Sequence, residues 1–121
     1  FAPLLTVKAT RDEPSRVIVT GSVAGLGAAV IHLTKNLAVE LGPRHILCNA
    51  IAPGFFPSKM ADGLINLQGG LKALEDYSPN KRLGKPEDIA GLVVFLGSRA
   101  SSHLNGAVIT TDGGSHLKGK L

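Results

Sequence analysis

The chain has 121 residues, a formal net charge of +4 and a single cysteine, and 44% of its residues are hydrophobic. This length allows one domain at most, one cysteine rules out an intrachain disulfide framework, and no apolar run reaches the roughly 20 residues of a membrane span. Basic residues are scattered and aromatic residues are few, which argues against nucleic-acid binding. We expect a cytoplasmic α/β protein that binds neither nucleic acid nor membrane.

The N-terminal half of the chain reads as a strand, a turn and a helix. A β-branched run over Arg16–Thr20 predicts a strand buried on both faces. A glycine-spaced turn follows over residues 21–27, and residues 28–41 predict a helix that stops at Gly42 and Pro43. The apolar face expected for this helix consists of Val30, Leu33, Leu37 and Leu41.

The C-terminal half repeats the alternation of strand and helix. His45–Ala52 predicts a second buried strand, so that the first two strands and their helix form a right-handed βαβ unit. Pro86 followed by two acidic residues predicts a helix start, and Ala107–Thr111 predicts a third strand. The apolar face expected for this second helix consists of Ile89, Leu92, Val93 and Leu96.

Three motifs occur in a fixed order along this half. They are Asn49–Phe55, Arg82–Ala90, and Asn105–Gly106 leading to Asp112–Gly114. Together they resemble the C-terminal half of the short-chain dehydrogenase/reductase family, closest to members similar to 3-oxoacyl-carrier-protein reductases. The resemblance covers nearly the whole chain, so residues 1–121 are expected to form a partial Rossmann-like, doubly wound parallel sheet with about three strands and flanking helices.

The resemblance also implies a site. Ser22 matches the catalytic serine of the family, which holds the substrate carbonyl or hydroxyl, and a loop of five matching positions would hold the nicotinamide of NADP or NAD: Pro53, Gly54, Phe55, Phe56 and Ser58. Asp112 resembles a strand-end acid with capping and subunit-contact roles. The Tyr-x-x-x-Lys pair that supplies the general acid/base of the family is absent between Gly25 and Ala28. Taken literally, this sequence is not expected to turn over substrate.

Two other segments match the residue pattern of a functional site. Gly21, Gly25 and Gly27 have the spacing of a phosphate-binding loop, but no acidic residue ends the next strand, where a ribose ligand is expected. Tyr77 and Lys81 spell Tyr-x-x-x-Lys, but Pro79 between them interrupts any helix that would align the two. We therefore expect a strand-to-helix junction and a surface turn, respectively.

Three functions remain in competition. The first is NAD(P)-dependent reduction of a keto group, or oxidation of an alcohol, in a protein that also contains the missing catalytic segment. The second is a catalytically inactive half-domain that self-associates or binds a partner through its open sheet edge. The third is a minimal nucleotide-binding module built on Gly21, Gly25 and Gly27. No metal is expected, because the four histidines have no ligand at suitable spacing.

Overall fold

The computed structural model describes residues 1–23, 28–58, 62–63 and 69–118. Helices separate the three strands, as expected for an α/β chain, and two of them, α4 and α5, lie between β2 and β3 in the sequence. In order, the elements are α1 (Ala2–Thr6), β1 (Ser15–Thr20), α2 (Ala28–Leu41), β2 (Ile46–Pro53), α4 (Leu71–Tyr77), α5 (Pro86–Gly97) and β3 (Val108–Thr111), with short 3-10 turns η1 (Gly42–Arg44), η2 (Arg99–Ser101) and η3 (Ser115–Leu117). None of the helices in these ranges is long and apolar enough to cross a membrane.

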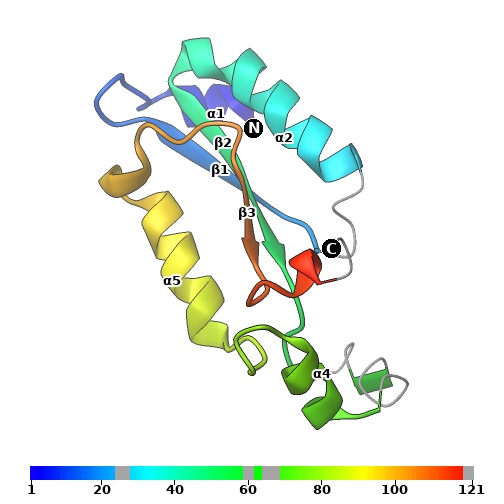
Figure 1. Ribbon diagram of the computed structural model, residues 1–121. Coiled ribbons are helices and arrows are strands. Elements are labelled where there is room, and N and C mark those ends of the chain that lie inside the picture. The colour runs from blue at the N-terminus through cyan, green and yellow to red at the C-terminus, as the bar shows by residue number, and fades with distance from the viewer. Residues whose placement is uncertain (24–27, 59–61, 64–68, 119–121) are drawn as a thin grey trace.

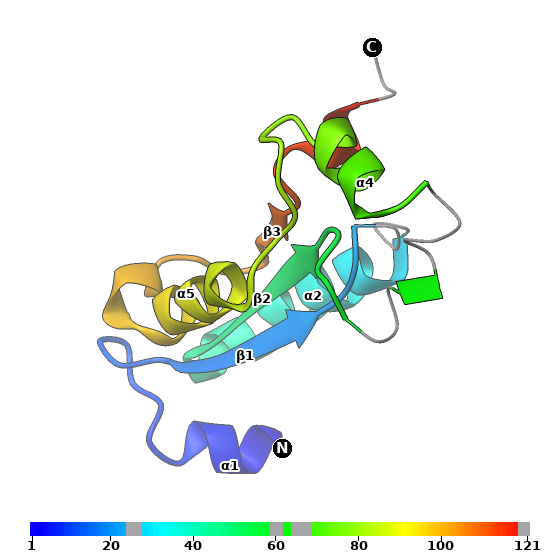
Figure 2. The same cartoon turned by 90° about the horizontal axis from the view of Figure 1, so that it is seen from below.

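The three strands form one parallel sheet in the order β1-β2-β3, which confirms the predicted partial Rossmann-like fold. Figures 1 and 2 show α2 along one face of this sheet and α5 along the other. Helices on both faces are the arrangement that a parallel sheet requires to bury its apolar side chains. The connection from β1 to β2 and the connection from β2 to β3 step across the sheet in the same direction, but they pass over opposite faces. One crossover is therefore right-handed and the other is left-handed.

The core is centred on β2. Ile46, Cys48 and Ile51 of this strand have no exposed surface, and burial raises the pKa of the Cys48 thiol. The prediction of a fully buried first strand was wrong, because Arg16–Val19 are only partly buried and Thr20 is exposed. Within the described residues β1 pairs with β2 alone, so its second edge has no neighbouring strand.

Both long helices turn a slightly different face to the sheet than the apolar pattern predicted. In α2 the buried positions are Thr34, Ala38 and Leu41, whereas Leu33 is 50% exposed. Thr34 is tolerated there because its hydroxyl donates to the carbonyl of Val30 at 2.7 Å. A run of apolar residues on two adjacent helix faces does not reveal which face is covered.

In α5, Leu96 is buried and Ile89 and Leu92 are partly buried, as predicted. Val93 was also expected on this face, but it is 40% exposed. Val94, next to it, is 71% exposed. The helix therefore presents an apolar surface away from the sheet, a feature of helices that are covered on more than one side.

Two asparagine side chains join the start of β3 to the core. Asn49, which is 4% exposed, donates through Nδ2 to Leu104 O at 2.9 Å and accepts at Oδ1 from Ala107 N at 3.0 Å. Asn105 accepts from Cys48 N at 2.9 Å and donates to the carbonyl of Ala38 at 2.9 Å. An amide is suited to these positions because it both donates and accepts.

The N-terminus of α5 is capped by Asp88. Its carboxylate accepts from Lys85 N at 2.8 Å and from both terminal nitrogens of Arg82, at 2.7 and 3.0 Å. The hydrogen bond from Arg82, followed by that from the Lys85 backbone, lowers the pKa of Asp88 to about 2. The predicted helix start at Pro86 is thereby confirmed, and the capping acid lies at the third helical position.

We predict that Asn49→Ala lowers the free energy of unfolding by about 2–4 kcal/mol, because it leaves the carbonyl of Leu104 and the amide of Ala107 without partners in a buried setting. Urea denaturation measures the change. Asn36→Ala, at an exposed position of α2, should stay within about 0.5 kcal/mol of the parent. Equal effects of the two substitutions would contradict the bridging role of Asn49.

We also predict that Asp88→Asn lowers the melting temperature at neutral pH and that this difference disappears in acid. The pKa of Asp88 is depressed in the folded state, so its stabilisation is complete above pH ~4 and is lost as the pH falls toward 2. Thermal melts from pH 7 to pH 2 measure the difference. Asp12→Asn, in an exposed loop, is the control for removing one negative charge. A difference between parent and Asp88→Asn that is unchanged at pH 2 would refute the assignment.

Candidate functional site

The candidate site lies where the parallel strands end, at the carboxyl edge of the sheet. Ser22 lies two residues after the end of β1 and is exposed. On either side of it, Gly21 N donates to Ile51 O and Val23 N donates to Pro53 O, both at 2.9 Å. These two main-chain hydrogen bonds hold the serine turn against the end of β2. Two of the predicted positions, Ser22 and Pro53, are therefore brought together.

The loop after β2 is held from the opposite side by β3. Gly54 N donates to Thr111 O at 3.1 Å, and a Cβ atom at Gly54 would lie 2.5 Å from the Cβ of Asp112. Only glycine fits this close approach without a shift of the neighbouring strand end. The first turn of the predicted nicotinamide loop is thus fixed between the ends of β1 and β3.

The next two residues of the loop contact a different part of the chain. The carbonyl of Phe55 accepts from Gly84 N at 3.0 Å, and its ring packs against Leu74 of α4 and Leu83. The ring of Phe56 lies directly against Gly84, where a Cβ atom would overlap it. Ser58, the last predicted loop position, is exposed. The loop therefore links the sheet edge to α4 and to the approach to α5.

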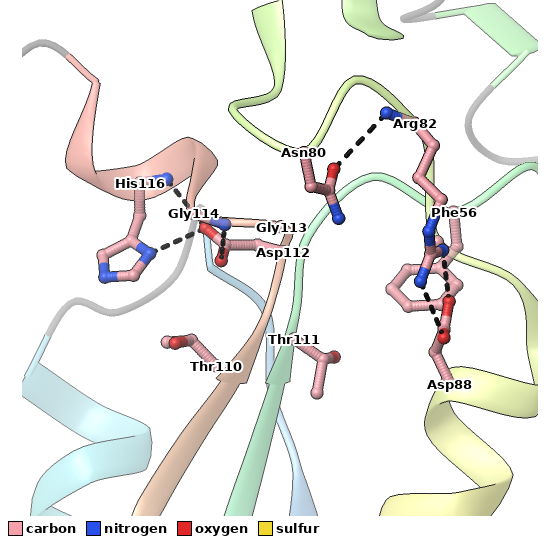
Figure 3. A pocket seen from close by; sticks show the side chains of 11 residues that line it. Phe56, Asn80, Arg82, Asp88, Thr110, Thr111, Asp112, Gly113, Gly114 and His116 are labelled. Carbon is pink, nitrogen blue, oxygen red and sulfur yellow. Dashed lines mark hydrogen bonds and ion pairs between the residues drawn. The ribbon is translucent and has the colours of Figure 1, made fainter.

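A cavity of about 450 Å³ lies beside this loop, at the end of β3 (Figure 3). Most of its lining residues are polar or glycine: Phe56, Asn80, Arg82, Gly84, Asp88, Thr110, Thr111, Asp112, Gly113, Gly114 and His116. Phe56 is the one residue of the predicted cofactor loop in this set, and Ser22 is not among them. Sequence reasoning did not assign Asn80 or His116 to a site, although the strand-end position of Asp112 gave a signal for this edge.

Asp112 organises the turn that closes the cavity. Its side chain is 3% exposed and accepts from Gly114 N at 3.0 Å, from His116 N at 2.7 Å and from Nδ1–H of the His116 ring at 2.7 Å. Burial acts to raise the pKa of Asp112, but these hydrogen bonds outweigh it and the pKa is lowered. The structure confirms the capping role that was expected for this acid, and it adds His116 as a partner.

The remaining sequence motifs have different outcomes. Gly25 and Gly27 lie outside the described residues, and the amide of Gly21 is already used in the hydrogen bond to Ile51. Tyr77 is the last residue of α4, whereas Lys81 lies in a turn with a φ of 59°. These two side chains do not share a helix face, as predicted. Among the described residues, no three His, Cys, Asp or Glu side chains gather in a way that could hold a metal ion.

Comparison with known proteins places this geometry in a family. Residues 16–116 match the sequence profile of the family described as Enoyl-(Acyl carrier protein) reductase. The chain is 41% identical to the rhamnolipids biosynthesis 3-oxoacyl-[acyl-carrier-protein] reductase of Pseudomonas aeruginosa, over 95% of this chain and 50% of that protein. It is 36% identical to the 7alpha-hydroxysteroid dehydrogenase of Escherichia coli, over 92% and 43%.

Solved structures agree with the sequence matches. The RhlG/NADP active-site complex of Pseudomonas aeruginosa superposes with a TM-score of 0.82 at 39% identity, covering 95% of this chain and 52% of that one. A gluconate 5-dehydrogenase from Burkholderia cenocepacia, in complex with NADP and tartrate, gives 0.78 at 27% identity, covering 86% and 46%. The chain spans about half the length of these relatives. It belongs to the short-chain dehydrogenase/reductase family and is similar to its 3-oxoacyl-carrier-protein reductases.

Proposed function

We propose that this chain contributes the substrate serine and the nicotinamide loop of an NAD(P)-dependent oxidoreductase that reduces a keto group or oxidises the corresponding alcohol. The observation that carries this proposal is the pinning of the Ser22 turn to the end of β2 through Val23 N and Pro53 O. It brings Ser22, an exposed residue, next to the start of the loop Pro53–Ser58 at the carboxyl edge of a parallel sheet, where ligands of open α/β sheets bind.

One feature of the structure supports a dinucleotide at this edge. Gly54 N and the carbonyl of Phe55 are both engaged within the protein, so the backbone of the loop is fixed before any ligand binds. Pre-organised backbone groups are the usual means of orienting a cofactor. Pro53, Gly54, Phe55, Phe56 and Ser58 are the residues that would hold the nicotinamide. When bound, NADP or NAD supplies or accepts the hydride.

Ser22 is suited to orient the substrate rather than to move its proton. A serine hydroxyl can donate a hydrogen bond to a carbonyl oxygen, but it does not ionise near neutral pH. The sequence contains no tyrosine near Ser22, because its one tyrosine is Tyr77. We therefore propose that a different residue, supplied by the protein that carries this chain, acts as the general acid/base.

The relatives support this reaction class and the choice of cofactor. One similar protein is a 3-oxoacyl-[acyl-carrier-protein] reductase, and one similar structure is an active-site complex with NADP. A keto group on a small or carrier-linked acyl chain is accordingly the substrate class we propose. NADP or NAD is the cofactor, and no metal is required.

We predict that Ser22→Ala lowers kcat of the protein that carries this chain by roughly 10²-fold, since one hydrogen-bond donor to the developing alkoxide is lost. NADPH oxidation with a 3-oxoacyl thioester measures the rate. Ser102→Ala, at an exposed position beyond η2, should leave kcat unchanged. An unchanged kcat in Ser22→Ala would contradict the role of Ser22. If the unsubstituted protein that carries this chain turned over no ketone, the reductase proposal itself would be refuted.

A second candidate function, self-association, is favoured by the exposed apolar side chains on both long helices. Val39 of α2 is 79% exposed and Leu33 is 50% exposed, while α5 exposes Val94 at 71%. Because α2 and α5 lie on opposite faces of the sheet, each helix is a separate candidate interface, and exposed apolar surface on either one can mark an interaction site. In addition, β1 and β3 each pair with β2 alone among the described strands. We propose a homo-oligomer formed through these helices.

We predict that Val39→Lys or Val94→Lys weakens self-association at least tenfold in Kd, because a buried lysine in an apolar interface loses its hydration. Sedimentation equilibrium over a hundredfold range of protein concentration measures Kd. Ala100→Lys, at an exposed position in η2, is the matched control. The variant that weakens self-association shows whether α2 or α5 forms the interface. If the unsubstituted protein is a monomer at every concentration, the proposed oligomer is excluded.

A further inference from the structure

The segment after β3 returns across the chain and lies against α4. The contacts between this segment and the end of α4 join residues that are about 40 positions apart in the sequence. The hydroxyl of Tyr77, at the end of α4, donates to the carbonyl of Lys118 at 3.1 Å. The ammonium of Lys118 lies 5.1 Å from the centre of the Tyr77 ring. The two residues thus hold each other by a hydrogen bond and a cation–π contact.

The turn between β3 and η3 makes a second contact with the same region. Gly113 and Gly114 have φ values of 62° and 85° and lie against the side chains of Asn80 and Pro79, which follow α4. A Cβ atom at Gly113 would overlap the Asn80 amide, and one at Gly114 would lie 3.3 Å from the Pro79 ring. This turn requires glycine for its conformation and for its close approach.

Asp112 fixes the base of this segment to the sheet. Its carboxylate holds Gly114 N and His116 N, and the His116 ring gives it a third donor. Because the Asp112 side chain is 3% exposed, these bonds are shielded from water. The segment therefore leaves the sheet in one defined direction, toward α4.

By itself α4 has little to hold it in place. It is seven residues long, its N-cap Gly70 makes no side-chain cap, and Leu74 is its one buried residue. Helices this short are unstable without tertiary contacts. Besides the packing of Leu74 on Leu83 and Phe55, the C-terminal end of α4 is contacted by Lys81, whose ammonium donates to the carbonyl of Asp76 at 2.6 Å, and by Lys118 of the segment after β3.

We propose that Asp112–Lys118 forms a C-terminal clamp that holds α4 against the end of β3. Tyr77 and Lys118 are the contact residues of this clamp, and His116 is its positioning residue at the base. Through the packing of Leu74 on Phe55, the clamp also fixes the loop that follows β2. The clamp consists of contacts within this chain, so it does not depend on the proposed reaction.

Amide hydrogen exchange followed by NMR, in the absence of cofactor, tests the clamp. The reporters are the amides of Leu74 and Ser78, which donate to the carbonyls of Gly70 and Leu74, and the reference is the amide of Ala50 in β2. Tyr77→Phe removes the hydroxyl and keeps the ring, Lys118→Ala removes the ammonium, and His116→Ala removes the third donor to Asp112. We expect each change to speed exchange of the two reporters roughly three- to tenfold, with Ala50 unchanged.

The matched controls are Lys35→Ala on α2 and His103→Ala beyond η2, both at exposed positions. They should leave the reporters at the parent rate. The clamp is overturned if the three clamp variants match the controls. It is also overturned if Leu74, Ser78 and Ala50 all accelerate equally, since that pattern reports global destabilisation. The double variant Tyr77→Phe/His116→Ala adds a check. If both residues belong to one clamp, its exchange rates should rise by less than the product of the two single-variant factors.

Discussion

The structure depends on the burial of β2, six of whose eight residues are buried, between its two parallel neighbours. A buried strand must pair every main-chain polar group, and here the ladder is extended beyond the strands by side-chain amides. The Asn49 side chain satisfies the backbone of Leu104 and Ala107 between η2 and β3, where regular pairing has not yet begun, and the Asn105 side chain bonds Cys48 N of β2 and the carbonyl of Ala38 in α2. This requirement explains why a polar residue, Asn49, occupies a core position in an otherwise apolar strand.

The same parallel arrangement decides where chemistry is possible. Because β1, β2 and β3 run in one direction, the residues that follow them converge at one edge, although they come from three distant parts of the chain. The serine turn, the Gly54 loop and the Asp112 turn meet there through short main-chain hydrogen bonds. Ser22 belongs to the junction of β1 with β2, whereas the cavity belongs to the end of β3. Phe56 is the predicted loop residue that borders the cavity.

The stability of this edge and the position of α4 are linked. Phe55 leaves the edge and packs on α4, while the segment after β3 reaches α4 from the other side through Tyr77 and Lys118. A short helix with one buried side chain thus connects two strand ends that carry different parts of the site. An ion pair stabilises the cavity wall separately, because Asp88, held by Arg82, caps the N-terminus of α5 there.

From the sequence alone, the order of β1, α2, β2, α5 and β3, the parallel sheet, the start of α5 and the family were predictable, because β-branched runs, Pro86 and the motifs from Asn49 to Gly114 act locally or through their order. The short helix α4 was not predicted. The sequence also indicated correctly that Tyr77 and Lys81 do not form a helical pair. Only the tertiary structure decided which apolar residues are buried. Thr34 rather than Leu33 faces the sheet, Val93 stays exposed, and β1 is only partly buried, because these outcomes depend on which neighbours cover each surface. The partnership of Asp112 with His116 and of Tyr77 with Lys118 likewise depends on how the chain folds back after β3, which no local pattern encodes.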